Sequence, residues 1–523
     1  MIQSTQTELG SCDSSNCPQV SPRRARGTQG IALCTLLVLA VATAPLSAQN
    51  YFPGGLAGTG GILPSLSTNG PWMGNWNHMF EARNAQPWAP GAIAISFARD
   101  TSGSPLVVDL GTPLFALTSL QADIAGYAAL PLPFAFPAAS PYAGLPFYTQ
   151  CGFVDTASPI GLSLSKGLAC RLGWTPAVFM ASSVAGAADP WWLLDPYSAT
   201  YAPIASGTNG MNNVTSAAFV NGGAQLWAST AFAPYLRWMD LTTSPPTVTT
   251  IPGLTAAVDA VHYDSARGII YAISSSIDML SAYDVNSGPS YGTLIGQSTG
   301  LGFGLYIAST LGNHGTRLYA AAALTGLLKE IDTDPSSPTW LSLSGFAIIP
   351  YGPNQASVMA MAASDAGTPQ VLIALQAYGQ IHGELARYDC AAQQFIDHNP
   401  TMTGRQNIGA QSVPAALIGI GPSEVAVASD CRHAAISAAF GGGQIGFLTL
   451  DPANAATWAW TLLSPGVPMT YVAGCSFLPD NTSIAFTSWS PSRAMIMDIW
   501  GNTLQNTPLG GGALNNIYTC VAR

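Results

Sequence analysis

An aspartate closes a short, mostly apolar segment seven times between residues 191 and 498. The segments read WWLLD, LRWMD, LSAYD, LLKEID, ELARYD, GFLTLD and AMIMD, and their aspartates are Asp195, Asp240, Asp284, Asp332, Asp389, Asp451 and Asp498. Successive aspartates lie 44 to 62 residues apart. A recurrence at such a period predicts copies of one supersecondary unit stacked on each other. We expect the repeated aspartate to cap a turn in each copy.

Each repeat also carries a large apolar residue in a strand-like segment 12 to 16 residues before its aspartate. These residues are Phe179, Trp227, Tyr271, Tyr319, Ile373, Ile436 and Phe486. Gly, Asn, Asp and Pro precede several of these segments and supply the tight turns between antiparallel strands. Each unit is therefore predicted to be a four-stranded sheet. Radial packing covers the faces of such sheets, which predicts an all-β chain with a seven-bladed β-propeller over residues 176–523.

Two stretches resemble known propeller families. GCSFLPDNTSIAFTS (474–488) resembles a hairpin of the TolB, YVTN and Trp-Asp propeller superfamilies, and VHYDSARGIIYAISSSIDMLSAYDVNSG (261–288) resembles a YVTN or lactonase-like blade. The resemblance extends over about residues 176–523. It implies the propeller fold and no particular activity, because these families include enzymes, scaffolds and binding proteins.

The strand count predicts how the ring closes. The first blade begins at its second strand, near Ala177, and the chain ends in NNIYTCVAR, which has the length and pattern of an inner strand. We therefore expect Ile517–Ala522 to supply the inner strand of the first blade.

Residues 1–48 are predicted to be a signal peptide. Arg23, Arg24 and Arg26 precede an apolar run over residues 31–42, and small residues follow up to Ala48. This order is typical of a secretory signal, and the run is shorter than a membrane span requires. We expect export to the extracellular space, periplasm or cell surface, with no membrane span in the mature chain.

The region before the propeller is predicted to have two parts. Residues 49–75 are rich in Gly and Pro, which predicts an irregular lead-in. Residues 76–175 contain short strand patterns broken by Pro and Gly, typical of a small antiparallel β-sandwich. GLPFYTQCGFVDTASPIGLSLSKGLACRLG (144–173) resembles a module of exported proteins from high-GC bacteria, and this resemblance implies no specific activity.

Composition limits the ligands. Only 8% of the residues are charged, and the formal net charge is −10. A weakly charged, acidic chain is a poor nucleic-acid binder, so we expect no nucleic-acid partner. No cofactor motif is present, and no cofactor is expected. The expected ligand is a protein or a carbohydrate.

Six cysteines follow residue 48, an even number that suggests disulfides in an exported protein. The predicted strand positions favour three pairs, namely Cys151–Cys170, Cys390–Cys431 and Cys475–Cys520. Fifteen pairings of six cysteines are possible, so these three are hypotheses.

A few polar residues are candidates for chemistry. Asp259 and His262 lie on or near the inner strand of the third blade, and Glu424 starts that of the sixth. Inner strands converge on the central channel, where these three could act in a lactonase-like hydrolase or lyase or simply solvate the channel. Asp332 and Asp334 are weak calcium candidates, although the Gly and the distal Glu of an EF-hand are missing.

The favoured function is that of an exported, non-catalytic binding or scaffold protein that uses a propeller face for recognition. The lactonase-like enzyme is the alternative. A quinone- or metal-dependent oxidoreductase is the least favoured interpretation, because no cofactor ligands stand out in the sequence.

Overall fold

The computed structural model describes residues 49–523 with gaps. The gaps fall at 53, 76–77, 103, 112–113, 135–144, 174–175, 183–189, 198–202, 208–210, 212, 287, 305–306, 323–325, 350–355, 366–368, 378–382, 397–409, 413–421, 439–444, 450–458, 465, 467–471, 490–491, 510–516 and 523. The predicted signal peptide, 1–48, lies outside these residues. The described elements are strands and three short 3-10 turns, η2 (Thr59–Gly61), η3 (Asn221–Gly223) and η4 (Ser275–Ile277). None of the described helices is long and apolar enough to span a membrane.

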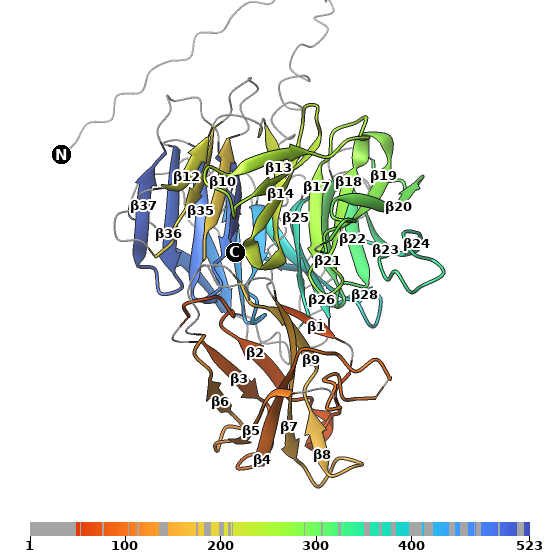
Figure 1. Cartoon of the computed structure of the whole chain (residues 1–523), viewed down its shortest axis with the longest axis vertical. Coiled ribbons are helices and arrows are strands. Elements are labelled where there is room, and N and C mark those ends of the chain that lie inside the picture. The colour runs from red at the N-terminus through yellow and green to blue at the C-terminus, as the bar shows by residue number, and fades with distance from the viewer. Residues whose placement is uncertain are drawn as a thin grey trace, which may run out of the picture. The chain divides into compact units, whose positions relative to one another are not determined.

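Two antiparallel sheets form the N-terminal module, drawn from red to gold in Figure 1. The larger sheet has the order β1-β9-β7-β4-β5, with β8 also paired to β7. Its strands are β1 (Gln49–Phe52), β9 (Gly167–Arg171), β7 (Pro146–Val154), β4 (Pro90–Ser96), β5 (Leu114–Gln121) and β8 (Leu162–Leu164). The smaller sheet consists of β2 (Ser65–Thr68), β3 (Met79–Arg83) and β6 (Ala128–Pro131).

The expected irregular lead-in at residues 49–75 needs correction. β1 pairs with β9, and β2 pairs with β3, so this segment contributes a strand to each sheet. Tyr51, Phe52 and Leu66 are buried there. The Gly- and Pro-rich runs between the strands conceal these short apolar segments, whose backbone groups complete the ladders of neighbouring strands.

Seven sheets make up the rest of the described chain, and each is built on four strands in an antiparallel order. The first sheet combines β38 (Ile517–Ala522), β10 (Val178–Ser182), β11 (Trp191–Leu194) and β12 (Pro203–Gly207). The second contains β13 (Val214–Val220), β14 (Gln225–Thr230), β15 (Leu236–Asp240) and β16 (Thr247–Thr250). The third contains β17 (Ala260–Asp264), β18 (Ile269–Ser274), β19 (Met279–Asp284) and β20 (Thr293–Thr299).

The remaining four sheets repeat this order. The fourth contains β21 (Ile307–Gly312), β22 (Arg317–Ala322), β23 (Leu327–Asp332) and β24 (Leu343–Ile348). The fifth contains β25 (Ala356–Ser364), β26 (Gln370–Ala377), β27 (Gly383–Asp389) and β28 (Gln394–Phe395), with β29 (Ala410–Ser412) also on β27. The sixth contains β30 (Pro422–Val427), β31 (His433–Ala438), β32 (Ile445–Thr449) and β33 (Ala459–Leu463). The seventh contains β34 (Val472–Phe477), β35 (Ser483–Trp489), β36 (Ser492–Asp498) and β37 (Thr503–Pro508).

The first strands of these sheets contact each other in sequence: β13 contacts β17, then β21, β25, β30, β34 and β38 follow, and β38 returns to β13. This cyclic order makes the region a β-propeller, and the all-β prediction is confirmed. The predicted closure is also confirmed, because β38 pairs with β10 in an antiparallel register that matches Val178 with Ala522.

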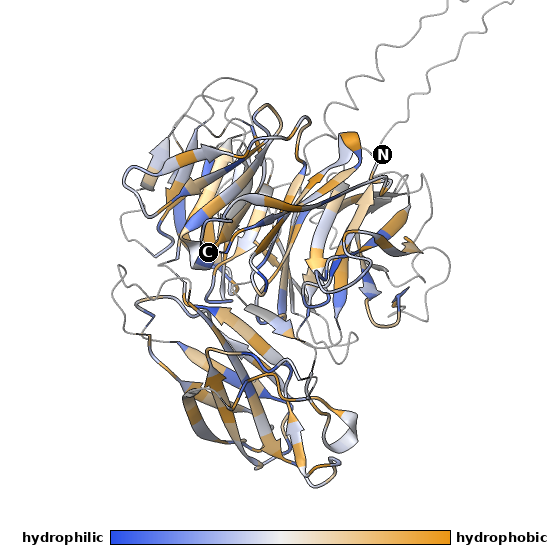
Figure 2. Cartoon of the chain, turned by 45° about the vertical axis from the view of Figure 1, so that its right-hand side comes forward, coloured by the Kyte–Doolittle hydropathy of each residue, from blue (hydrophilic) through white to orange (hydrophobic). Residues whose placement is uncertain are grey.

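The repeated apolar position forms the core of the blades. All seven residues singled out by the sequence lie on second strands and are fully buried: Phe179, Trp227, Tyr271, Tyr319, Ile373, Ile436 and Phe486. Hydrophilic segments are short and scattered over the strands in Figure 2. Burial of both faces of each sheet explains why the strands read as apolar runs with few charges.

The repeated aspartate caps the turn that follows the third strand. The carboxylate of Asp284 accepts the amide of Asn286 at 2.9 Å, two residues ahead. The same contact is made by Asp195, Asp240, Asp332, Asp389 and Asp498. Asp451, in the sixth repeat, lies outside the described residues. This is an Asx turn, as the sequence predicted.

The N-terminal module contacts the turns that join first to second strands. Arg171 Nε donates to Ser265 O at 3.0 Å in the third blade. Asn481 Nδ2 in the seventh blade donates to Thr68 O at 3.2 Å. One apolar cluster joins Leu66 and Leu168 of the module to propeller residues such as Leu372. The module therefore covers one face of the ring through the same type of turn in several blades.

No disulfide links the described cysteines, which corrects the predicted pairs Cys151–Cys170 and Cys390–Cys431. Cys170 of β9 is opposite Phe147 of β7, whereas Cys151 lies four residues further along β7. At about 3.4 Å per residue, this offset of roughly 14 Å exceeds the span of a disulfide. Cys151 and Cys170 remain buried thiols.

The predicted pair Cys390–Cys431 differs from expectation because the two thiols lie in different apolar clusters. Cys390 lies in the core between the fourth and fifth blades, whereas Cys431 belongs to the cluster that reaches the N-terminal module. Ser476 accepts the Ala522 amide of β38, so the preceding Cys475 points to the opposite side. There its thiol donates to Ala435 O at 3.8 Å. The side chain of Cys520 lies outside the described part of the chain, so the pair Cys475–Cys520 stays a prediction.

Candidate functional site

His262 does not face the central channel. It lies on β17, where it is fully buried, and its Nε2 is 2.8 Å from the hydroxyl of Ser309 on β21. The ring therefore sits between the third and fourth blades. Burial lowers the pKa of His262 to about 3, so the imidazole is neutral at ordinary pH and is positioned as a core residue.

Asp259 serves the backbone of its own blade. It precedes β17, and its carboxylate accepts the amide of Ser275 at 2.6 Å. Burial raises the pKa of Asp259, although the hydrogen bond from Ser275 opposes this shift. Asp259 and His262 are three positions apart in an extended segment, so their side chains leave on opposite faces.

Glu424 is distant from both in the ring order. It is buried on β30 opposite Ser437, and β30 neighbours β25 and β34. The described contacts therefore do not bring Asp259, His262 and Glu424 together, and they give the lactonase-like alternative no assembled catalytic set.

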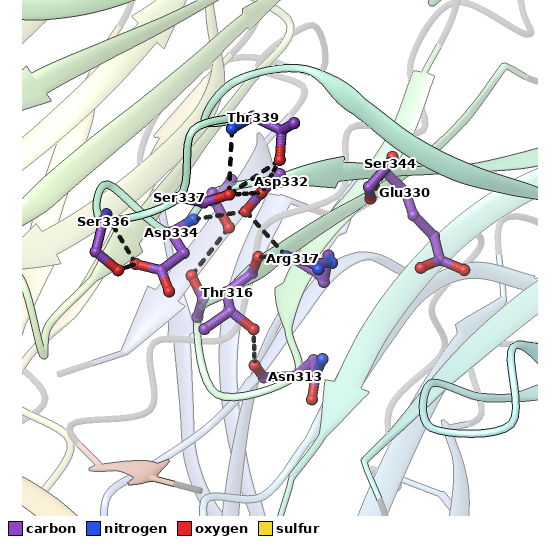
Figure 3. Close-up of polar contacts among 12 residues, drawn as sticks. Asn313, Thr316, Arg317, Glu330, Asp332, Asp334, Ser336, Ser337, Thr339 and Ser344 are labelled. Carbon is purple, nitrogen blue, oxygen red and sulfur yellow. Dashed lines mark hydrogen bonds and ion pairs between the residues drawn. The ribbon is translucent and has the colours of Figure 1, made fainter. Parts of the chain in front are cut away.

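Asp332 and Asp334 have a turn-forming role (Figure 3). The carboxylate of Asp332 accepts hydrogen bonds from Arg317 at 2.9 Å, from the Asp334 amide at 3.1 Å, and from the hydroxyls of Ser337 at 2.5 Å and Thr339 at 2.7 Å. Burial alone would raise the pKa of Asp332, but the hydrogen bonds outweigh it and hold the pKa below its usual value.

Donors thus surround the oxygens that a calcium ion would require. Asp334 accepts the amide and the hydroxyl of Ser336 at 3.0 and 2.8 Å. Among the described residues, no group of three or more His, Cys, Asp or Glu side chains is arranged to hold a metal ion.

The ring face away from the N-terminal module carries a feature that the sequence did not single out. Phe232, between β14 and β15, is 51% exposed, and Ile277, between β18 and β19, is 41% exposed. Both occupy turns from second to third strands, which lie at the opposite ends of the blades from the turns that contact the module. The only sequence signal is an apolar residue at a turn tip, where polar residues are usual.

A neighbouring loop on this face is held in place by two charges. Asp278 accepts the amides of Gly302 and Phe303 at 2.8 and 2.7 Å. The ammonium of Lys329 donates to Leu301 O at 2.7 Å and also to Gly302 O. The loop after β20 is therefore pre-organised, because both charged groups bond to its backbone.

No protein-family model matches the chain, and no curated protein sequence matches it. Among solved structures, it is similar to a 6-phosphogluconolactonase-like protein from Bacteroides uniformis, at 11% identity and a TM-score of 0.49, with 67% of this chain and 100% of that chain covered. It is also similar to a functionally unknown protein from Desulfotomaculum acetoxidans, at 10% identity and a TM-score of 0.47, covering 66% and 98% of the two chains. The Dos1 propeller has 12% identity and a TM-score of 0.39, covering 57% and 73%.

Proposed function

We propose that this chain is an exported, non-catalytic binding protein whose propeller recognises a partner through the face opposite the N-terminal module. The observation that carries the proposal is the exposure of Phe232 and Ile277 on that face. They come from adjacent blades, and the cores of protein interfaces are built around such apolar side chains with few charges. A protein surface is the ligand class that fits them.

The covered face supports this choice. The N-terminal module contacts the turns at Ser265 and Asn481, so these turns are not available to another protein. The opposite face has the pre-organised loop after β20, held by Asp278 and Lys329. A surface that is already ordered loses little conformational entropy on binding.

Two finer assignments belong to the same proposal. We assign the seven sheets as the complete ring of a propeller related to the YVTN, lactonase-like and TolB-like superfamilies, on the strength of the repeats in 176–523. We also propose that residues 1–48 direct export to the extracellular space, periplasm or cell surface, since arginines precede a short apolar run there.

Site-specific photo-crosslinking tests the recognition face. The full chain is produced in its native host with a photoreactive amino acid at position 232 or 277, and with the same residue at 346 on the outer strand β24 as a matched exposed control. We expect one discrete adduct from positions 232 and 277 and none from 346. The double variant Phe232→Ala/Ile277→Ala should weaken capture of the same partner at least tenfold. Adducts from position 346 alone, or capture unchanged in the double variant, would contradict the proposal.

A further inference from the structure

One exposed tryptophan lies on the N-terminal module in an unusual backbone conformation. Trp88, in the turn between β3 and β4, has 62% of its surface exposed and a φ of 61°. This left-handed region is disfavoured for bulky side chains. A large apolar residue that adopts it without being buried stabilises the fold little, so the position points to recognition.

Hydrogen bonds between two turns hold Trp88 in this conformation. Its amide donates to Asp123 O at 3.1 Å, and Gln121 Nε2 donates to its carbonyl oxygen. A further bond joins the Ala85 amide to Gly126 O at 3.1 Å. The turn between β5 and β6 thus fixes the turn of Trp88 and places Ile124, which is 73% exposed, beside it.

Besides Ile124, uncharged amides surround Trp88, and the charged groups described in these turns are engaged in other contacts. Asn84, Gln86 and Gln121 are exposed amides next to it in the two turns and at the end of β5. The Asp123 carboxylate accepts the amides of Ala125 and Tyr127 at 2.8 and 2.9 Å.

The cation at the end of β3, Arg83, is also engaged. Arg83 pairs with Glu81 at 3.3 Å and lies over the Tyr127 ring. On β5, the exposed residues leading away from the turn are Ser119 and Leu117, which are likewise uncharged.

We propose that Trp88 and the amides around it form a binding platform for a neutral carbohydrate. The apolar C–H face of a sugar ring packs on the indole, and the amides of Asn84, Gln86 and Gln121 both donate to and accept from sugar hydroxyls. The lack of unengaged charge favours neutral sugars over acidic ones. This platform is separate from the propeller face proposed above, so either proposal can fail without the other.

Affinity electrophoresis tests the platform with soluble polysaccharides cast in the gel: laminarin, galactomannan and arabinoxylan as neutral probes, and alginate as an acidic one. The full chain should be retarded by at least one neutral probe and not by alginate. Trp88→Ala should weaken this retardation at least tenfold, whereas Trp88→Phe should retain part of it. Trp88→Gly is a second loss variant that suits the backbone, because glycine adopts positive φ freely.

Trp500 provides the matched control. It is 73% exposed in the turn after β36, where its amide donates to the capping Asp498 at 3.1 Å. Trp500→Ala should migrate like the wild type on every probe. The proposal is overturned if no neutral polysaccharide retards the chain, if folded Trp88→Gly is retarded as strongly as the wild type, or if Trp500→Ala loses retardation equally.

Discussion

The amide of Ala522 donates to the hydroxyl of Ser476 at 3.2 Å, and this bond joins the last strand of the chain to the first strand of the seventh blade. β38 also pairs with β10 along its length and contacts β13 and β35. The C-terminal strand therefore connects the first, second and seventh blades. Among the described residues, hydrogen bonds and strand packing hold the ring closed.

Removal of residues 517–523 should open the ring. β10 would keep β11 and lose β38, the partner on its inner side, and Val178 and Met180, which are fully buried, would be exposed to water. The loss of these bonds and of buried apolar area should cost on the order of 5 kcal/mol or more. Ser476→Ala should cost about 1 kcal/mol by removing a single bond. Urea unfolding followed by tryptophan fluorescence measures both, and a deletion variant as stable as the wild type would rule the closure out.

The sequence could predict the propeller because its signals are local. In the six repeats where it is described, the aspartate at the end of the third strand bonds to a backbone amide two residues ahead, so the residue type and its position define the turn. The buried position occupied by Trp227 and its six counterparts is equally local, since it recurs on every second strand. The C-terminal strand followed from counting strands against this repeat.

The candidate site was less predictable because it depends on side-chain direction. His262 is on an inner strand, as expected, yet it faces Ser309 between blades. Cys475 and Ser476 are adjacent, and only the serine faces β38. A shift of one residue along a strand turns a side chain to the opposite face of the sheet, so which residues meet between blades depends on the register. The strands in 49–75 were missed because β1 and β2 are only four residues long and pair with partners distant in sequence.

Asp332 should matter for stability and not for calcium binding. Asp332→Ala removes the acceptor for Arg317, Ser337 and Thr339. Because the carboxylate is buried and these donors lose a shared partner, unfolding should become easier by about 2–3 kcal/mol. Asp284→Ala, which removes an exposed cap, should cost about 1 kcal/mol. Differential scanning calorimetry with EDTA or millimolar calcium should give the same melting temperature, and a clear upward shift with calcium would contradict this role.

His78 should make the protein sensitive to acid. The ring is buried, with Nδ1 2.9 Å from Leu132 O and Nε2 2.6 Å from the Thr68 hydroxyl. The Leu132 carbonyl can only accept, so Nδ1 carries the proton and Nε2 accepts from Thr68. Burial lowers the pKa of His78 to about 4, and the backbone bond to Leu132 only partly opposes this shift. Phe80 and Phe134 pack on the ring.

Between the unfolded pKa of about 6.5 and the folded value, the unfolded chain binds a proton that the folded chain does not. The contribution of His78 is therefore complete above about pH 6.5 and is lost as the pH falls toward 4. Over this pH range, the contribution of His78 to the free energy of unfolding should change by about 1.4 kcal/mol per pH unit, or about one proton. Urea unfolding from pH 7.5 to 4.5 should show a shallower pH dependence in His78→Gln than in the wild type. Parallel curves for the two proteins would refute the assignment.

Lys166 should couple the N-terminal module to the propeller. Its ammonium lies 3.3 Å from Nε2 of His314 and 3.4 Å from Asp365 O, and burial lowers the pKa of Lys166. Asp365 is half-buried and accepts the amides of Asn313 and His314 at 3.0 and 2.9 Å. Lys166→Glu would place a second carboxylate beside Asp365 and should cost about 3–5 kcal/mol, in the range for breaking a buried charge arrangement. Lys166→Met keeps the apolar stem and removes a half-buried charge, so it should change stability by no more than about 2 kcal/mol.

Because Leu66, Leu168 and Leu372 share one apolar cluster, the module and the propeller should unfold together. Calorimetry of the wild type should show one transition, and the Lys166→Glu transition should move to lower temperature, either intact or split in two. The Lys166→Met variant tests whether the lower melting temperature of Lys166→Glu comes from the change of charge rather than from the change of side-chain volume. Two separate transitions in the wild type, or equal melting temperatures for the Glu and Met variants, would show that the Lys166 ammonium does not couple the two parts.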